Sequence, residues 1–530
     1  MKQLPIQFIE YTRRIMGEER WQKFMEGMEQ LCPNSVRINK GKIIHNSQFI
    51  IHNCCCADGD SADNSANCCC ADVSPANNSA NCCCAGASPA NNSANCCCAG
   101  VSPANNYELC IMHYELSQVG WCLNGYYLSE RPEYTLDPLL HAGCYYVQEA
   151  SSMFLDRVLR QYVSSPVRML DMCAAPGGKT TTAMGALPGG SVVVSNEPVR
   201  LRANILAENV QKWGCPMNIV TNNYPRDYAR SGLQFDVVLC DVPCSGEGMF
   251  RKDEGAISEW SVANVEKCWQ LQREIVADAW TCLRPGGILI YSTCTYNIKE
   301  DEENVRWICE NFGAEMLPVK IGEDWNITGS LLAGFDAPVY RFIPGISRGE
   351  GLFMAVLRKS GDAEEGSRRM KPARPNTDKS RQKTDKSKLK VEKFPHQWLR
   401  SQSDFCVYRQ GDRFVAIHKE MSDLYAVACQ SLNIVHAGVT LGELKGRDII
   451  PQQSLALSTQ LCADAFPMAE LSYPDAITYL RREAVVLPPS VPRGFVVVTF
   501  NGHPLGFVKN LGNRANNLYP QEWRIRKNIN

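Results

Sequence analysis

The stretch Val167-Arg168-Met169-Leu170-Asp171-Met172-Cys173-Ala174-Ala175-Pro176-Gly177-Gly178-Lys179-Thr180 decides the fold. Its apolar start, Val167–Leu170, predicts a buried parallel strand, and its glycines predict a tight turn into a helix. Downstream, apolar runs alternate with helical periodicity, which is typical of an α/β domain with a doubly wound parallel sheet. Ligands of such sheets bind beyond the carboxyl ends of the strands, so we expect the functional residues there.

The predicted elements follow one another at regular intervals after this stretch. Phe353–Leu357 is predicted to close the sheet as an antiparallel edge. The other predicted strands are Ser191–Ser195, Met217–Thr221, Phe235–Cys240 and Gly287–Tyr291, and the predicted helices are Val199–Trp213 and Val262–Leu283.

The glycine turn admits two interpretations. Gly177-Gly178-Lys179-Thr180 suggests a phosphate-binding P-loop, but that motif needs a glycine five residues before Gly178, where this chain has Cys173. The favoured interpretation is an S-adenosylmethionine pocket in a Rossmann-like fold, in which the glycines let the backbone approach the cofactor. Glu197, at the end of the second strand, would hold the ribose hydroxyls. Asn222 and Asn223, at the end of the third, would bond the adenine edge.

Two cysteines follow the fourth and fifth strands. Cys244 lies in Asp241-Val242-Pro243-Cys244-Ser245-Gly246-Glu247-Gly248, and Cys294 lies in Tyr291-Ser292-Thr293-Cys294-Thr295-Tyr296-Asn297. Either thiol alone could be a small buried apolar side chain. As a pair at neighbouring strand ends, they indicate a methyl transfer through a covalent cysteine adduct.

The chemistry behind this hypothesis is methylation at C5 of cytosine, a carbon that is a poor nucleophile. A thiolate that adds to C6 makes C5 enamine-like and able to accept a methyl group. An acidic group must protonate or hold N3 and the exocyclic amine, which suits Asp241. A base must then remove the C5 proton so that the thiol can leave, and two thiols suggest divided roles.

Composition places several segments outside this domain. We predict an N-terminal helical, RNA-binding module over 1–50, built around Phe8–Leu31 and an extended piece at Pro33–Asn39. A 14-residue repeat with Cys-Cys-Cys triplets fills 54–106, and we expect a disordered insertion there, with metal binding as the alternative. The remaining predicted units are a connection (107–165), the methyltransferase domain (166–359), a basic linker (360–393) and a C-terminal α+β RNA-binding domain (394–530).

Bulk properties exclude some classes of protein. The net charge is −1, so RNA binding requires local patches such as 368–393, with eleven Lys/Arg against three Asp/Glu. No apolar run reaches the roughly 18 residues of a membrane span, and no signal-peptide core follows Met1. Twelve of the 27 cysteines lie in the repeat and the others are scattered along the chain. This distribution fits reduced thiols better than a framework of disulfides. We expect a cytoplasmic monomer without a membrane partner.

Together these motifs resemble the Nop/Sun family of RNA cytosine-C5 methyltransferases. Tyr145–Met153 is similar to the family's segment before the cofactor loop, and Gly506–Pro520 resembles the PUA-like tail of its RsmF-like branch. The resemblance implies Cys294 as the nucleophile on C6 and Cys244 as the helper in proton removal and product release. It implies a cofactor site made of Cys173, Ala174, Ala175, Pro176, Gly177, Gly178, Lys179, Glu197, Asn222 and Asp241, and no metal.

One departure from the family and three hypotheses remain. The family often has an acidic residue after the third strand, where this chain has Thr221-Asn222-Asn223-Tyr224. The first hypothesis is methylation of small-subunit ribosomal RNA, free or within the subunit. The second is the same chemistry on transfer RNA. The third is a non-catalytic RNA-binding or ribosome assembly factor.

Overall fold

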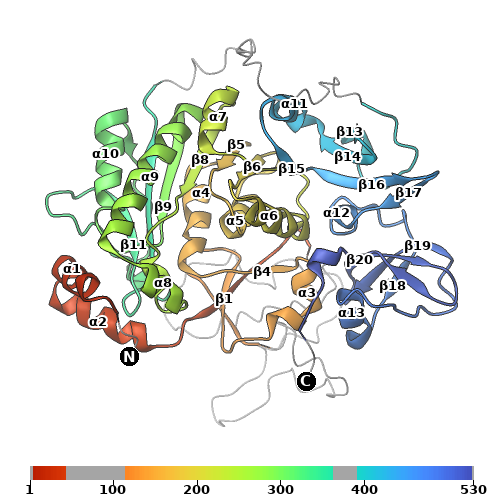
Figure 1. Cartoon of the computed structure of the whole chain (residues 1–530), viewed down its shortest axis with the longest axis horizontal. Helices are drawn as coiled ribbons and strands as arrows, with labels where there is room; N and C mark the ends of the chain where they lie inside the picture. The colour runs from red at the N-terminus through yellow and green to blue at the C-terminus, as the bar shows by residue number, and fades with distance from the viewer. Residues whose placement is uncertain (1–3, 43–113, 362–390, 528–530) are drawn as a thin grey trace, which may run out of the picture.

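A nine-stranded sheet forms the centre of the computed structural model, which describes residues 4–42, 114–361 and 391–527 (Figure 1). Its strand order is β10-β12-β9-β8-β5-β6-β7-β15, with β11 paired to β12. Five central strands are parallel: β5 (Arg168–Asp171), β6 (Val192–Asn196), β7 (Asn218–Thr221), β8 (Phe235–Asp241) and β9 (Leu283–Thr293).

The chain winds outward from β5 in both directions. It passes from β5 to β6 and β7, and then returns to place β8 on the other side of β5 and β9 beyond it. The reversal between β5 and β8 is the switch point at which doubly wound sheets bind ligands. The loops after β5, β8 and β9 therefore meet at one edge. The fold is the predicted doubly wound methyltransferase fold.

Helices cover both faces of this sheet because alternate strand residues point to opposite faces. Leu170 and Met169 illustrate this alternation, since they belong to different apolar clusters on the two sides of β5. Ser261 caps α9 by accepting a hydrogen bond from Asn264 N. The helices around the sheet are α4 (Phe154–Tyr162), α5 (Gly178–Ala186), α6 (Arg200–Trp213), α7 (Pro225–Ser231), α8 (Glu254–Glu259), α9 (Val262–Cys282) and α10 (Glu302–Phe312).

One end of the sheet differs from the prediction. β12 (Leu352–Arg358) is antiparallel to β9, as predicted, but it is not the edge. Two further antiparallel strands pair with it, β10 (Glu315–Met316) and β11 (Val339–Phe342). These strands have only two and four residues, too few to stand out in the sequence.

The N-terminal region is helical and then extended, as predicted. The run Phe8–Leu31 breaks at Gly17 (φ +75°) into α1 (Ile6–Met16) and α2 (Glu18–Glu29). Both helices pack against the loops after β8 and β9, with the Phe8 ring edge-on to that of Phe250 at 5.0 Å and the Phe24 ring edge-on to that of Tyr296 at 5.1 Å. A small antiparallel sheet follows, composed of β2 (Leu116–Gln118), β3 (Gly125–Leu128), β1 (Asn34–Ile38) and β4 (Tyr145–Val147), with α3 (Pro138–His141) beside it.

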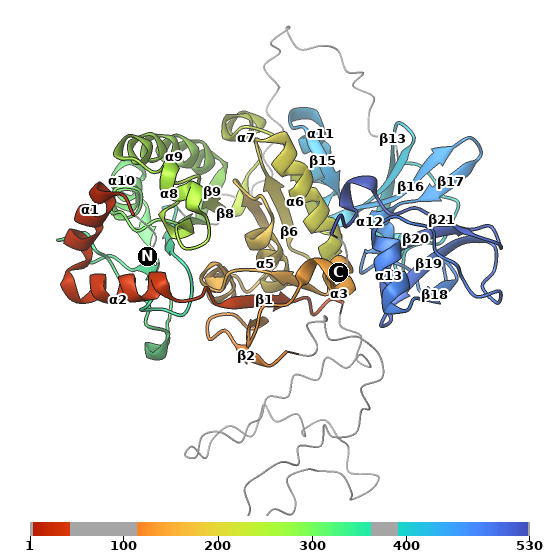
Figure 2. The same cartoon turned by 60° about the horizontal axis from the view of Figure 1, so that its bottom comes forward.

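The C-terminal region forms two four-stranded sheets (Figure 2). One contains β13 (Phe405–Gln410), β14 (Arg413–His418), β16 (Val439–Lys445) and β17 (Asp448–Pro451). The other contains β18 (Met468–Glu470), β19 (Gly494–Phe500), β20 (His503–Asn510) and β21 (Ala515–Asn517). The helices of this region are α11 (Ser422–Ser431), α12 (Gln453–Ala456) and α13 (Tyr473–Leu480).

A glycine joins the C-terminal region to the central sheet. The apolar run Ile434–Thr440, predicted as one strand, is divided at Gly438 (φ +53°). Before the glycine, β15 (Ile434–Ala437) pairs antiparallel with β7, and after it β16 pairs with β14. Residues of the predicted C-terminal unit (394–530) therefore complete the methyltransferase sheet. The Cys-rich repeat and nearly all of the linker predicted at 360–393 lie outside the described residues.

Gly438→Ala should lower the free energy of unfolding by more than about 2 kcal/mol. A Cβ at this position would lie 2.2 Å from the backbone oxygen of Ala416, and the left-handed backbone adds strain. At Gly446 (φ +67°) no atom of the described residues lies within 4 Å of the Cβ position, so Gly446→Ala reports strain alone, about 1–2 kcal/mol. Urea unfolding measures both, and equal losses would show that the close approach at Gly438 does not matter.

Among the helices in the described parts of the chain, none is long and apolar enough to cross a membrane.

Candidate active site

The two predicted thiols meet at the carboxyl ends of β8 and β9. Cys244 Sγ and Cys294 Sγ are 3.0 Å apart, and both residues are partly exposed. The hydrogen bond to Cys294, burial and the charge of Glu300 raise the pKa of Cys244 well above its ordinary value. Cys244 is therefore held as a thiol that can donate its proton toward Cys294 Sγ.

The loops that carry the thiols are locked together. Gly248 N donates to Cys294 O at 2.7 Å, and a Cβ on Gly248 would lie 2.7 Å from that oxygen, so only glycine fits. The fully buried Glu247 accepts hydrogen bonds from Tyr296 N and Asn297 N, and also from the side chains of Trp260 and Asn297. The distance between the thiols is thus fixed by backbone contacts.

Lys179 and Asp241 form an ion pair beside the thiols, with 2.9 Å between Lys179 Nζ and Asp241 Oδ2. Burial alone would lower the pKa of Lys179, but the charge and hydrogen bond of Asp241 and the charge of Cys294 raise it. Lys179 is thus held as an ammonium beside Asp241 and Cys294. The structure therefore brings three predicted residues, Lys179, Asp241 and Cys294, close enough to interact electrostatically.

The loop after β5 forms a cradle of the kind predicted for the cofactor. Gly177 adopts φ +113° and a Cβ there would lie 3.3 Å from Leu206, which favours glycine. Ala174 N donates to Asn196 O, which ties the loop of Cys173–Lys179 to the end of β6. Asp171 is fully buried and accepts from Thr180 Oγ1, and burial raises its pKa to about 7.

Glu197 fits the predicted contact with ribose hydroxyls. Its carboxylate is 1 % exposed, and one oxygen accepts from Val199 N. The other, Oε2, accepts no hydrogen bond from the described residues, although Arg202 Nη1 lies 3.4 Å away. A buried carboxylate oxygen without a donor is costly, and a ligand hydroxyl would satisfy it. The residues present therefore fit S-adenosylmethionine.

The sequence suggested that the side chain of Asn222 is free to bind adenine, but in the structure it already makes two hydrogen bonds. Its amide nitrogen donates to Glu197 O and Pro198 O, both at 2.8 Å. Asn223 likewise accepts a hydrogen bond from Asn433 N, just before β15. Asn222 thus holds the turn that presents Glu197, and its contact with adenine stays a prediction.

Sequence reasoning missed Gln272 and Glu300, which flank Cys244. Both are 0 % exposed. Glu300 begins the acidic run Glu300–Glu303, which looks solvated in sequence, and Gln272 lies in the middle of α9. No sequence pattern identified either residue.

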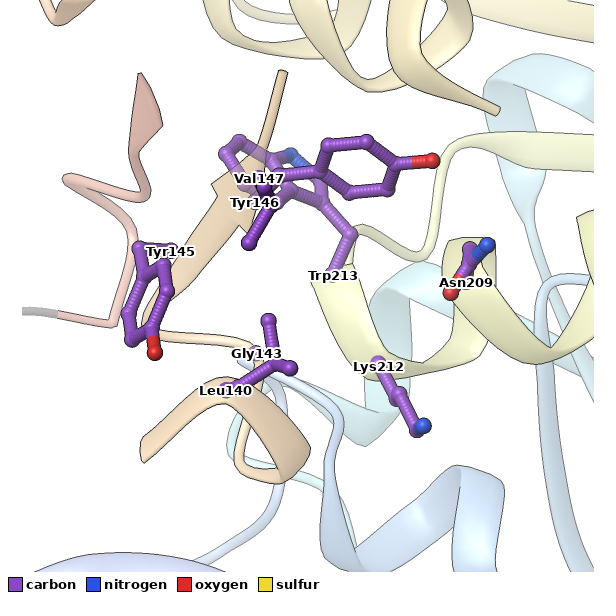
Figure 3. A pocket seen from close by; sticks show the side chains of 8 residues that line it. All are labelled: Leu140, Gly143, Tyr145, Tyr146, Val147, Asn209, Lys212 and Trp213. Atoms are coloured by element: carbon purple, nitrogen blue, oxygen red, sulfur yellow. The ribbon is translucent and has the colours of Figure 1, made fainter. Parts of the chain in front are cut away.

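A separate pocket of about 210 Å³ lies between α6, α3 and β4 (Figure 3). Asn209 borders it and donates to Pro176 O in the glycine loop. The described residues that line it include neither Cys244 nor Cys294 and no carboxylate. The candidate active site is therefore the group of residues at the strand ends, not this pocket. The residues that line the pocket are Leu140, Gly143, Tyr145, Tyr146, Val147, Asn209, Lys212 and Trp213.

The fold and the glycine cradle define an S-adenosylmethionine-dependent methyltransferase. Family models match three stretches: 16S rRNA methyltransferase RsmB/F at 163–358, the RsmF PUA domain at 466–525, and the N-terminal domain of 16S rRNA methyltransferase RsmF at 99–150. The chain belongs to the RsmB/F family of methyltransferases. The predicted family resemblance and its PUA-like tail are therefore confirmed.

Curated relatives agree with this assignment, and a solved structure shares the fold. Ribosomal RNA small subunit methyltransferase F of Salmonella heidelberg is 30% identical over 432 residues, 77% of this chain and 85% of the relative. The Enterobacter sp. protein of the same name is 29% identical over 431 residues, 77% of this chain and 84% of the relative. The structure described as "Crystal Structure of PH0851" has a TM-score of 0.51 at 19% identity, covers 67% of this chain and 66% of its own, and shares the fold.

Glu197→Gln should weaken S-adenosylmethionine binding by about 10-fold or more, because hydrogen bonds to a charged acceptor contribute about 1.5–3 kcal/mol. Isothermal titration calorimetry would measure the dissociation constant. Glu259→Gln, on an exposed turn of α8, serves as the control and should bind as the wild type does. Unchanged affinity in Glu197→Gln would remove Glu197 from the cofactor site.

Proposed function

We propose that this protein transfers a methyl group from S-adenosylmethionine to C5 of a cytosine in RNA through a covalent adduct with Cys294. The observation that carries the proposal is the 3.0 Å approach of two thiols at the ends of β8 and β9, beside the Lys179–Asp241 ion pair. Simple methyl transfer to an oxygen or nitrogen atom needs no such pair of thiols.

The residues that would hold the cofactor are the loop Cys173–Lys179 and Glu197, with Asn222 behind Glu197. When bound, S-adenosylmethionine supplies an electrophilic methyl group. Asp241 and Lys179 would hold the N3 and amine edge of the cytosine, since the pair offers an acceptor and a donor side by side. The target base is thereby oriented with C6 toward the thiols.

Cys294 acts first in this scheme. Its thiolate bonds to C6, and the electron pair of the C5–C6 double bond becomes available at C5, which takes the methyl group. Before attack, Cys244 Sγ lies 3.0 Å from this sulfur and the Lys179 ammonium is close to it. This assigns the nucleophile to Cys294.

Cys244 acts second. The hydrogen bond with Cys294, more than burial or the charge of Cys294, raises the pKa of Cys244. Once Cys294 Sγ is bonded to C6 it carries no charge and no longer holds the Cys244 proton, so Cys244 can lose that proton to solvent. The Cys244 thiolate then removes the C5 proton, the C5–H electron pair re-forms the C5–C6 double bond, and the C6–S bond breaks to return the Cys294 thiolate. The two sulfurs thus perform opposite halves of one cycle.

We propose small-subunit ribosomal RNA as the substrate, because the relatives that align with 77% of the chain carry that name. The second C-terminal sheet, β18–β21, lies in the stretch that matches the RsmF PUA domain, which such a substrate would contact. Transfer RNA is the second candidate. Bisulfite sequencing of ribosomal and transfer RNA from a strain that lacks the gene would show which 5-methylcytosine disappears; loss of none would contradict the function.

A further inference from the structure

The peptide groups on both sides of Cys244 are clamped by two buried side chains. Gln272 Nε2, from α9, donates to Pro243 O at 2.9 Å, and Glu300 Oε2 accepts from Ser245 N at 3.0 Å. Pro243 and Ser245 are the residues directly before and after Cys244. Gln272 and Glu300 also bond to each other at 2.6 Å, so one unit holds the whole turn.

The clamp is itself fixed by the surrounding polar core. Glu300 Oε1 accepts from Asn297 Nδ2 at 2.8 Å, and Glu300 N donates to Asn297 Oδ1 at 2.8 Å. Gln272 Oε1 accepts from Asn304 Nδ2 at 2.8 Å and from Tyr291 OH at 3.2 Å. The position of the Cys244 turn is thereby coupled to β9, which carries Tyr291, and to α10, which carries Asn304.

Within the described part of the chain, the Glu300 carboxylate faces neutral donors. Its partners are the N–H of Ser245 and the NH₂ groups of Gln272 and Asn297. Burial and the charge of Glu247 raise the pKa of Glu300 to about 7, and the donors oppose that shift. A carboxylate buried among neutral donors is a costly arrangement, which simple packing of the core would not require.

We propose that Glu300, with Gln272, is a positioning residue that holds the Cys244 thiol where it can remove the C5 proton, and so controls product release. The inference rests on the proposed function, since it assigns Glu300 to the second half of that cycle. Glu300 touches neither thiol through a hydrogen bond in the described structure and acts through the Pro243–Ser245 backbone.

Glu300→Gln tests this role, because the amide replaces one carboxylate oxygen by an NH₂ group, which would face either the Asn297 donor or the donors of Ser245 and Gln272. The loss of these hydrogen bonds would release the turn. Turnover should fall by about 10- to 100-fold, the effect of one lost buried hydrogen bond to a charged group. The covalent protein–RNA adduct should accumulate, while the KM for S-adenosylmethionine stays unchanged. Glu310→Gln, exposed on the helix α10 that follows Glu300, is the matched control and should turn over normally.

Two further variants keep the test decisive if Glu300→Gln folds poorly. Glu300→Asp keeps the carboxylate and should recover part of the release rate, and Gln272→Met, which loses the donor to Pro243 O, should also accumulate adduct. Circular dichroism and cofactor titration would confirm that each variant is folded.

The outcomes separate this inference from the proposed function. If Cys244→Ala accumulates adduct but folded Glu300→Gln and Gln272→Met release product at the wild-type rate, the positioning role is overturned and the function stands. If the Glu300 variants form no adduct although folded, Glu300 serves Cys294 instead and the inference is wrong. If neither the wild type nor Cys244→Ala ever forms an adduct, the proposed function itself fails.

Discussion

Cys294→Ala should form no covalent adduct with RNA and should lose methyl transfer by at least about 10⁴-fold, as expected when a nucleophile is removed. Cys244→Ala should still add Cys294 to the base and accept the methyl group, and then stall. The stalled thioether survives denaturing gels, so the variant should migrate as a protein–RNA species that nuclease digestion collapses. Labelled methyl groups would mark that species.

The direction of this asymmetry is the informative result, because either assignment of roles predicts two impaired variants. Cys309→Ala, a partly buried thiol on α10, is the control and should neither stall nor lose activity. An adduct from Cys294→Ala and none from Cys244→Ala would exchange the two roles. No adduct from either variant, with normal cofactor binding, would favour a non-catalytic protein.

Deleting 391–530 should abolish cooperative folding of the remainder. The deletion removes β15 from the central sheet and takes Ile417, Met421, Leu424 and Tyr425 out of the apolar cluster that also contains Leu170 and Leu289. Truncation of one large buried side chain costs about 2–5 kcal/mol, and a whole domain is stable by only about 5–15 kcal/mol. Four such losses total about 8–20 kcal/mol, which is as large as the whole margin, as a thermal unfolding scan would show.

A cut chain provides the control for this deletion. With a protease site inserted between residues 362 and 390, the two pieces should stay together on gel filtration after cleavage, because the sheet and the cluster hold them. Cofactor binding should persist. Separation of the pieces, with full cofactor affinity in 1–361, would show that the methyltransferase domain folds alone.

Much of the fold could be predicted because apolar runs mark buried parallel strands. The structure places β6 at Val192–Asn196 and β8 at Phe235–Asp241, each within a residue of its predicted bounds. Failures occurred where one glycine changes the direction of an otherwise uniform pattern. At Gly17 and Gly438 a positive φ divides a run whose periodicity continues on both sides.

The candidate site also contains residues that could be predicted from the sequence and residues that could not. The rule that ligands gather at the carboxyl ends of strands is enough to bring Cys244, Cys294 and Asp241 together from the sequence alone. It could not identify Gln272, which is 29 residues from its partner Pro243, or Glu300, which is 55 residues from its partner Ser245. Side chains that act through another residue's backbone leave no pattern in a single sequence.

Under the proposed function, the joint at Gly438 also bears on how an RNA would be aligned with the thiols. Only this residue separates the last residue of β15 from the first of β16, so the C-terminal sheets cannot swing on a tether relative to the thiols. An RNA gripped by those sheets would reach Cys294 only with a nucleotide at the matching offset from the grip. The proposed target nucleotide would then be set by its distance along the RNA from these sheets.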